Sequence, residues 1–295
     1  MKKNKTTVKA KALDIFYRVL SNCSTRCLFR IANFFAYIAY YTRNQLSTLA
    51  RQNIKLCFPE LTESQQQKIV FGSLHHTSSA FFEIAALWNH PLEDVLNSVK
   101  TEDVDQKFYS SEKSKIIIAP HHGSWEMLNL WLADKETSYS LYKPAKSVGV
   151  DEYVLNKRSR NTAILVPANT SGLRRLLHGL KKTKSICMIL PDQRPAKNTA
   201  QVNAPFYNIN APTSLLIKRL ARKLECDIFI ASVTRNLNSA DYHLTIKALQ
   251  ADEFNKDDFE SATYLNKSIQ NLIKSDISQY QWTYRRFDKS VYKTT

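Results

Sequence analysis

Short apolar runs alternate with longer amphipathic stretches from Lys115 onwards, and this alternation constrains the fold more than any other feature of the chain. Short runs of Ile, Val and Leu predict buried strands, whereas apolar residues at helical spacing predict amphipathic helices. Strands and helices that alternate in this way form βαβ units, whose strands pair in parallel while the helices cover the sheet. We therefore predict an α/β fold with a mostly parallel central sheet flanked by helices.

The same pattern locates most of the elements. The predicted strands are Lys115–Ala119, Ser138–Tyr142, Ala163–Val166, Ile186–Leu190, Asp227–Val233 and Tyr242–Ile246. The predicted helices between and after them are Trp125–Ala133, Val150–Arg160, Ser171–Leu180, Pro212–Leu224 and Ala262–Ile273. A further helix is expected after Thr62, because Thr62 and Gln65 have the spacing of a capping box and apolar residues follow at helical intervals.

Glycine and cysteine usage argues against several ligand classes. The chain has only five glycines and no Gly-x-Gly pair, so the dinucleotide-binding and P-loop fingerprints are absent. Its five cysteines include no Cys-x-x-Cys pair, and the adjacent histidines at 75–76 and 121–122 have no third ligand at metal-binding spacing. We therefore expect no metal and no cofactor.

The charge of the chain is unevenly placed. Lys and Arg number 42 against 26 Asp and Glu, a net charge of +16, and residues 1–60 hold eleven cations and only two acids. This basic region includes an apolar and aromatic stretch, Leu13 to Tyr41, which Arg18, Arg26 and Arg30 interrupt. Its longest clean run, Ile31 to Tyr41, is shorter than the roughly 20 residues that span a bilayer.

Such a segment suits a basic amphipathic helix that lies among lipid head groups, with cations on phosphate and rings among the acyl chains. An ordinary surface helix and a tilted spanning anchor with snorkelling arginines are the alternatives. We predict a membrane-associated region at residues 1–60, followed by a catalytic domain at residues 61–295.

A candidate site follows the first buried strand. His121 and His122 come directly after it, Gly123 makes a turn, and Ser124 is placed to cap a helix with Glu126 in its first turn. Carboxyl ends of strands are where sites form in open α/β sheets. A hydrogen bond from the His121 imidazole to Glu126 would fix the tautomer and leave the other ring nitrogen free to accept a proton from a hydroxyl.

This arrangement favours base-assisted attack by an alcohol on an activated acyl group. The Gly-x-Ser-x-Gly turn of a serine nucleophile is absent from the sequence. Two plainer interpretations remain open: Glu126 stabilises only the helix N-terminus, or the histidines bind a metal.

His121-x4-Glu126 after a buried strand resembles the signature of the glycerolipid acyltransferase superfamily, and nearly the whole chain resembles the late lipid A acyltransferases. Further motifs carry the resemblance: Arg51 to Leu61, Tyr142-Lys143-Pro144, Arg158-Ser-Arg160, Pro191-Asp192-Gln193, Pro205-Phe206-Tyr207 and Gln279 to Phe287. The resemblance implies a glycerolipid-acyltransferase-like fold, with no cofactor.

The resemblance also implies a reaction. A fatty acyl chain would pass from acyl carrier protein to a hydroxyacyl group of a Kdo-lipid IVA-type lipid A precursor, at the cytoplasmic face of the inner membrane of a Gram-negative bacterium. His121 would be the general base and Glu126 its partner, while Arg158 and Asp192 would support the site. His122 and Lys143 depart from the residues common in the family at these places.

Other residues are weighed from their positions. Lys143, Arg235 and Arg285 are candidates for contacts to substrate phosphate or the acidic carrier, whereas surface or interdomain ion pairs are the better interpretation of Arg160 and Arg286. Asp192, after a strand, is expected to orient Arg158 or a substrate group. The backbone amides of Gly123 and Ser124 are candidate oxyanion donors.

Three alternative functions remain. The acceptor could be a lysophospholipid or another hydroxylated membrane lipid, or the chain could be an inactive homologue. A non-catalytic basic protein that binds membranes or nucleic acid is the third. It explains the charge but not the site residues at strand ends, and no RNA-binding or helix-turn-helix pattern is present, so we expect no nucleic acid partner.

Overall fold

A computed structural model of the chain describes residues 2–293, with side chains from residue 8 onwards. Its centre is a seven-stranded sheet in which all but one of the neighbouring pairs are parallel. The strands run across the sheet in the order β1 (Val99–Val104), β9 (Tyr242–Leu249), β8 (Cys226–Arg235), β2 (Ser114–Ile118), β5 (Ile186–Ile189), β3 (Ser138–Tyr142) and β4 (Ala163–Pro167). The predicted mostly parallel α/β architecture is therefore confirmed.

The antiparallel pair has a simple cause. Strands β8 and β9 are joined only by residues 236–241, where the Asn236 amide donates to the Asp241 carbonyl over 2.9 Å. A parallel crossover takes a dozen or more residues, so a connection of this length closes a hairpin instead.

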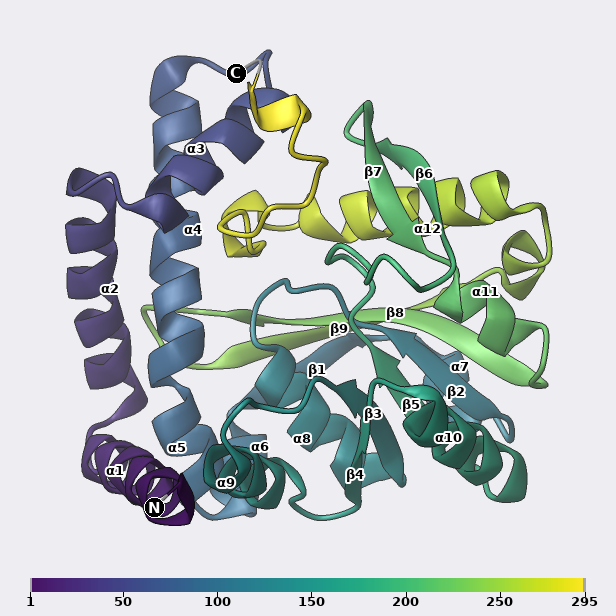
Figure 1. The fold of residues 1–295 in the computed structure, drawn as a ribbon, viewed down its shortest axis with the longest axis horizontal. Helices are drawn as coiled ribbons and strands as arrows, with labels where there is room; N and C mark the ends of the chain where they lie inside the picture. The colour runs from purple at the N-terminus through teal and green to yellow at the C-terminus, as the bar shows by residue number, and fades with distance from the viewer. Residues whose placement is uncertain (1, 294–295) are drawn as a thin grey trace.

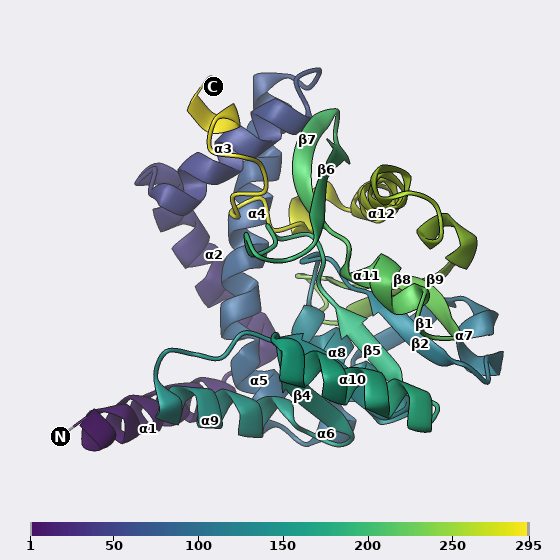
Figure 2. The ribbon, with the colours of Figure 1, turned by 45° about the vertical axis from the view of Figure 1, so that its right-hand side comes forward.

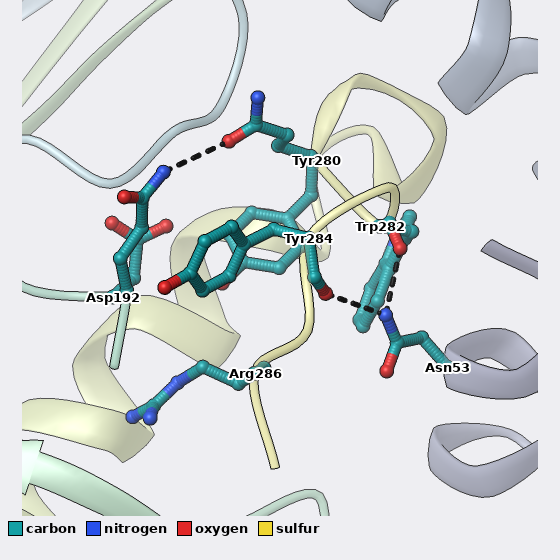
Figure 3. Close-up of a pocket in the computed structure, with 8 residues that line it drawn as sticks. Asn53, Asp192, Tyr280, Trp282, Tyr284 and Arg286 are labelled. Atoms are coloured by element: carbon teal, nitrogen blue, oxygen red, sulfur yellow. Dashed lines mark hydrogen bonds between the residues drawn. The ribbon is translucent and has the colours of Figure 1, made fainter. Parts of the chain in front are cut away.

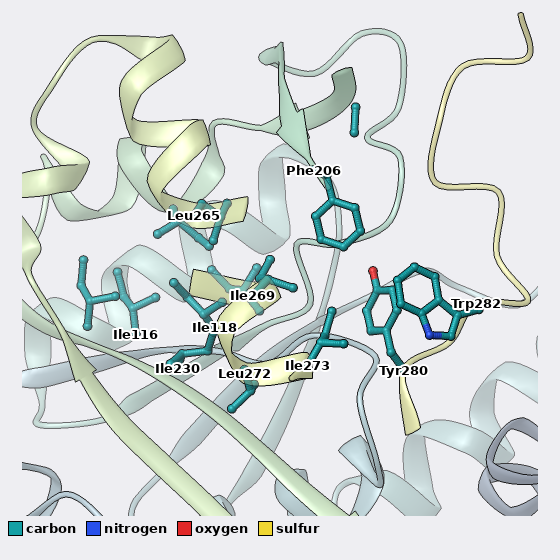
Figure 4. Packing of buried hydrophobic residues seen from close by; sticks show 14 of the residues in the cluster. Ile116, Ile118, Phe206, Ile230, Leu265, Ile269, Leu272, Ile273, Tyr280 and Trp282 are labelled. Carbon is teal, nitrogen blue, oxygen red and sulfur yellow. The ribbon is translucent and has the colours of Figure 1, made fainter. Parts of the chain in front are cut away.

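Side chains alternate along β2 between the two faces of the sheet, and each face carries its own core. Ile116 and Ile118 pack with α10 (Thr170–Lys182) and α12 (Asp258–Ile273). Ile117 and Ala119 pack on the other face with α8 (Trp125–Lys135). Figure 4 shows the first of these cores, with Ile116 and Ile118 facing the apolar side of α12. Both faces of the sheet are thus covered, as a run of buried isoleucines requires.

The amino-terminal helices stand along one side of the sheet. Helices α2 (Thr25–Tyr41) and α4 (Glu63–Phe82) run side by side, and α3 (Gln45–Cys57) lies near the carboxyl terminus (Figures 1 and 2). The capping box predicted at Thr62 and Gln65 is present at the start of α4. Among residues 2–293, no helix combines the length and apolar character needed to cross a membrane. The remaining helices are α1 (Lys2–Ser21), α5 (Ile84–Asn89), α6 (Leu92–Asn97), α7 (Gln106–Ser110), α9 (Val148–Arg158) and α11 (Leu216–Ala221), with 3-10 turns η1 (Ala251–Phe254), η2 (Ile277–Gln279) and η3 (Val291–Lys293).

The structure corrects the predicted helix Pro212–Leu224. Its first residues belong to β7 (Ile209–Ser214), which pairs with β6 (Gln201–Phe206) in a hairpin, so only α11 is helical. Tyr207 and Asn208 both have positive φ, as a two-residue type I′ turn requires. Four leucines at 215, 216, 220 and 224 indicated the longer helix, but residues 212–214 are held extended by pairing with β6 and the helix ends at Ala221.

Candidate active site

The candidate site lies where the carboxyl ends of three neighbouring parallel strands meet. His121 follows β2, Asp192 follows β5, and Lys143 follows β3. A cavity of about 450 Å³ opens here. Its walls include His121, Trp125, Glu126, Tyr142, Lys143, Arg158, Met188, Leu190 and Gln193. The strand order therefore brings together side chains that are distant in the sequence, as the topology of open parallel sheets predicts.

Asp192 holds His121 by two hydrogen bonds. The imidazole Nδ1 lies 2.9 Å from Oδ1, and the His121 backbone N–H donates to Oδ2 over 2.9 Å. A carboxylate only accepts, so Nδ1 carries the proton and Nε2 has a free lone pair. That lone pair accepts from the Gln193 side-chain amide, 3.1 Å away. Nε2 is thus the basic nitrogen.

Asp192 is itself 2% exposed. Burial alone would raise its pKa, but electrostatic attraction to the His121 imidazole and the hydrogen bonds from His121 together lower the pKa below its ordinary value. Burial, and then the negative charge of this carboxylate, raise the pKa of Tyr280 well above its ordinary value, and Figure 3 shows Asp192 facing Tyr280, Tyr284 and Arg286 of the carboxyl-terminal segment. The side chain that contacts the imidazole is therefore an ionised carboxylate.

The expected hydrogen bond between His121 and Glu126 is replaced by a different pairing. Glu126 lies in the first turn of α8 and forms an ion pair with Arg158, from the last turn of α9. Asp192, brought alongside by β5, occupies Nδ1 of His121 instead. Asp192 therefore does not orient Arg158, whereas its other expected role, to orient a substrate group, stays a prediction. All four predicted residues are close to one cavity, but the carboxylates have exchanged partners.

His122 points away from the cavity. It is 1% exposed, its Nε2–H donates to the Asp276 carbonyl over 2.9 Å, and burial lowers its pKa. His121 is therefore the imidazole of the pair that faces the cavity.

The turn at Gly123 fixes where His121 lies. Gly123 has a φ of +66°, and a Cβ built there would lie 2.0 Å from the Val233 carbonyl oxygen. Its amide donates to the Gln279 carbonyl over 3.1 Å, and the Ser124 amide donates to the Val233 carbonyl over 2.7 Å. The prediction that these two amides are oxyanion donors is therefore wrong, because both already have partners.

Comparison with known proteins adds an independent finding. Residues 9–289 match the family described as bacterial lipid A biosynthesis acyltransferase. The chain belongs to this family, and the protein is an acyltransferase. The acyltransferase is 23% identical over 243 residues to the lipid A biosynthesis palmitoleoyltransferase of Escherichia coli K12, a match that covers 81% of this chain and 78% of that protein.

Two further relatives are similarly distant. The lipid A biosynthesis acyltransferase of Haemophilus influenzae is 21% identical, with 82% of this chain and 77% of the relative covered. The lipid A biosynthesis lauroyltransferase of Escherichia coli K12 is 20% identical, with 81% and 78% covered.

Arg235 of the acyltransferase is buried and does not line the active-site cavity. Its Nε and Nη2 donate to the Glu83 carboxylate over 2.7 and 2.6 Å, and both side chains are almost wholly buried. Ser124 Oγ donates to the same carboxylate over 2.7 Å. The prediction of a substrate contact at Arg235 is wrong, because Glu83 occupies it. Sequence reasoning missed Glu83, whose only signal is an acid among apolar residues where α4 meets α5.

Of the remaining predicted cations, only Lys143 is at the active-site cavity, as expected. Arg285 instead lies over the Tyr292 ring, 5.7 Å from its centroid. The sequence predicts surface or interdomain ion pairs at Arg160 and Arg286. Arg160 instead donates to two backbone carbonyls. The buried Arg286 donates to the Pro212 carbonyl and to side-chain oxygens of Thr213 and Asn266. Among the described residues, no cluster of three or more His, Cys, Asp or Glu side chains is placed to hold a metal ion.

Two sequence motifs of the acyltransferase meet behind Asp192. Asn53 of α3 donates to the carbonyls of Trp282 and Tyr284 over 2.7 and 2.8 Å (Figure 3). Its Oδ1 accepts from the Tyr292 hydroxyl over 2.8 Å. The motif at residues 51–61 thereby anchors the one at residues 279–287, whose Tyr280 lines a small pocket together with Asp192.

Proposed function

We propose that the enzyme transfers a fatty acyl chain from acyl carrier protein to a hydroxyacyl group of a Kdo-lipid IVA-type lipid A precursor. The observation that carries this proposal is the His121 imidazole in the cavity wall, with Nδ1 bound to Asp192 and Nε2 available as a base. Membership of the lipid A biosynthesis acyltransferases supplies the reaction class, and the relatives named for lipid A biosynthesis support the choice of acceptor.

In this proposal His121 is the general base. Nε2 takes the proton of the acceptor hydroxyl while the hydroxyl oxygen attacks the thioester carbonyl carbon. The tetrahedral intermediate then breaks its C–S bond, and the leaving thiolate receives the proton from the imidazolium. The Asp192 carboxylate stabilises the imidazolium between these two transfers. Gln193 must leave Nε2 when the acceptor hydroxyl arrives, because both use the same lone pair.

Glu126 and Arg158 act as a pair in this scheme. Arg158 lies in the cavity wall with its side chain 30% exposed, whereas that of Glu126 is 6% exposed. A guanidinium held by a buried carboxylate is fixed in one orientation and can stabilise negative charge on a substrate or intermediate. Glu126 is then a positioning residue for Arg158, and Lys143 is a second cation for the same purpose.

We also propose that residues 1–60 associate with the cytoplasmic face of the inner membrane. Helices α1 and α2 expose large apolar side chains, which are Val8, Ile15, Phe16, Val19, Phe34, Phe35, Tyr37, Ile38 and Tyr41. Arg26 and Arg30 are exposed on α2 as well. This mixture suits an interfacial helix pair beside anionic head groups. A glycerolipid-acyltransferase-like class for the fold is part of the same proposal.

The test is product analysis with the purified enzyme. Acyl carrier protein loaded with a fatty acid is incubated with Kdo-lipid IVA or with a lysophospholipid, and the products are identified by mass spectrometry. We expect one added acyl chain on Kdo-lipid IVA. In cells, deletion of the gene should remove one secondary acyl chain from lipid A. Acylation of the lysophospholipid alone would reject the proposed acceptor.

A further inference from the structure

A second cavity lies between α1 and α9, which run side by side in Figures 1 and 2. It has a volume of about 460 Å³ and shares no lining residue with the active-site cavity. Four cations line it: Lys11, Arg18, Lys157 and Arg160. The only carboxylate in its walls is Asp14, so the lining carries a net charge of +3. A concentration of cations of this kind attracts an anionic ligand.

Asp14 leaves much of this charge uncompensated. Its carboxylate pairs with Arg18 Nε at 2.7 Å and lies 3.7 Å from Lys157 Nζ, so a single acid is shared between two cations. Lys157 Nζ is oriented by a further hydrogen bond of 2.7 Å to the Asn89 side-chain oxygen, and its side chain is 19% exposed. The ammonium group is therefore held at the cavity with most of its carbon stem buried.

Arg160 is fixed more firmly. Its guanidinium donates to the backbone carbonyls of Leu87 and His90, at the end of α5, and makes no ion pair among the described residues. Burial lowers the pKa of Arg160, because the positive charge has lost part of its hydration. A bound anion would restore the missing stabilisation. A guanidinium presents planar, preorganised donors that suit a phosphate, and the two carbonyls fix its orientation here.

The cavity also has an aromatic wall. The rings of Trp88 and Tyr153 meet edge to face with centroids 6.0 Å apart, and both residues line the cavity. Rings beside cations suit a ligand that has an apolar surface next to an anionic group, such as a phosphorylated sugar.

The end of α9 connects this cavity to the active site. Arg158 lines the active-site cavity, whereas Lys157 and Arg160, its near neighbours in sequence, line the second one. We propose that the second cavity binds a phosphate group on the sugar head of the acceptor lipid while the acceptor hydroxyl lies at His121. This inference rests on the proposed function, and it assigns to α1 a part in acceptor recognition.

The test uses the Lys11→Ala/Lys157→Ala double variant of the full chain. A matched control, Lys181→Ala/Lys182→Ala, removes two exposed lysines from α10, which does not line either cavity. A third variant, Lys11→Arg/Lys157→Arg, keeps the charge. Equilibrium binding is measured without acyl donor, in detergent micelles that contain the bisphosphorylated acceptor lipid or the same lipid after phosphatase treatment. Circular dichroism melting checks that each variant folds.

We expect the alanine double variant to bind the phosphorylated lipid about tenfold more weakly and the dephosphorylated lipid as wild type does. The control and the arginine variant should bind both lipids normally. An equal loss on both lipids, or no loss on either, would overturn the inference. Binding to phosphatidylglycerol vesicles is measured as well. If the alanine double variant binds these vesicles more weakly but prefers the phosphorylated over the dephosphorylated lipid as wild type does, the cavity binds bulk phospholipid and the inference is overturned. If the wild type does not acylate Kdo-lipid IVA, the proposed function fails. The binding measurement needs no acyl transfer, so it still decides whether the second cavity binds the phosphate group.

Discussion

Asp192 uses both oxygens of one carboxylate to hold a single residue, His121, by its imidazole and by its own backbone amide. The two residues lie 71 positions apart in the sequence and at the ends of neighbouring strands. The imidazole cannot rotate or change tautomer without breaking a hydrogen bond to a buried charge. Because the base is already oriented, no entropy is lost in positioning it during each turnover.

His121→Ala is expected to lower kcat by about 10² to 10⁴, the usual contribution of general base catalysis. Steady-state kinetics with acyl carrier protein thioester measure this loss. The matched control is His178→Ala, which removes an exposed imidazole from α10 and should leave kcat unchanged. Near-normal turnover by a folded His121→Ala enzyme would remove His121 from the mechanism.

Asp192→Asn and Glu126→Gln should affect different kinetic constants. Loss of the charged hydrogen bond to His121 should reduce kcat about 10- to 100-fold, since such bonds contribute about 1.5–3 kcal/mol, and should change KM little. Glu126→Gln releases Arg158 and should raise KM in larger proportion than it lowers kcat. The opposite result, with kcat more sensitive to Glu126, would return the role of imidazole partner to Glu126.

Glu83→Gln is expected to destabilise the fold by about 3–5 kcal/mol, because it leaves the buried Arg235 guanidinium without a counter-charge. Urea unfolding followed by circular dichroism gives the free energy of unfolding. Glu253→Gln, which breaks an exposed pair with Lys256, is the control and should unfold close to wild type. Equal stability of the two variants would show that the Glu83 pair contributes no more than a surface contact.

Gly123→Ala should damage stability and activity together. The added methyl would lie 2.0 Å from the Val233 carbonyl at a backbone φ of +66°, so the turn must shift and carry His121 with it. We expect a loss of more than about 2 kcal/mol in thermal or chemical unfolding, with reduced kcat in whatever protein remains folded. An active, wild-type-stable Gly123→Ala enzyme would disprove this rigid turn.

Stability should fall as the pH drops below about 6.5. Burial lowers the pKa of His122 and, more strongly, of His76, so the folded protein keeps both neutral while the unfolded chain takes up protons. Each contributes a slope of up to about 1.4 kcal/mol per pH unit between its unfolded and folded pKa. His122→Gln should make the dependence shallower by up to one such increment between pH 7 and 5, whereas the control His178→Ala should not. An unchanged slope in His122→Gln would mean that the pKa of His122 is the same in the folded and unfolded protein, against this prediction.

The sequence predicts those parts of the fold that depend on local pattern. Buried runs such as Ile116 to Ile118 locate the strands of the central sheet, and all six strands predicted from such runs are present. Strand β1 escapes prediction because its residues are mostly polar and exposed at the edge of the sheet. The β6–β7 hairpin escapes because Pro205 and Pro212 disfavour a strand assignment.

The sequence predicts which residues form the candidate site, but not which of them pair with one another. His121, Glu126 and Asp192 are recognisable from their places beside strand ends and from motif resemblance. Which carboxylate contacts the imidazole depends on β2 and β5 being neighbours, a property of strand order that no spacing within one motif encodes. Glu83 and Arg235 form a pair for the same long-range reason, 152 positions apart.

Asn53 has a practical consequence for anyone who shortens the chain. Removing residues 1–60 to obtain a more soluble protein would remove the Asn53 side-chain amide, which donates hydrogen bonds to the carbonyls of Trp282 and Tyr284. The freed tail includes Tyr280, which lines the same small pocket as Asp192. A truncated preparation would thus be expected to lose catalytic competence through its opposite terminus, and weak activity in such a preparation would say little about membrane attachment.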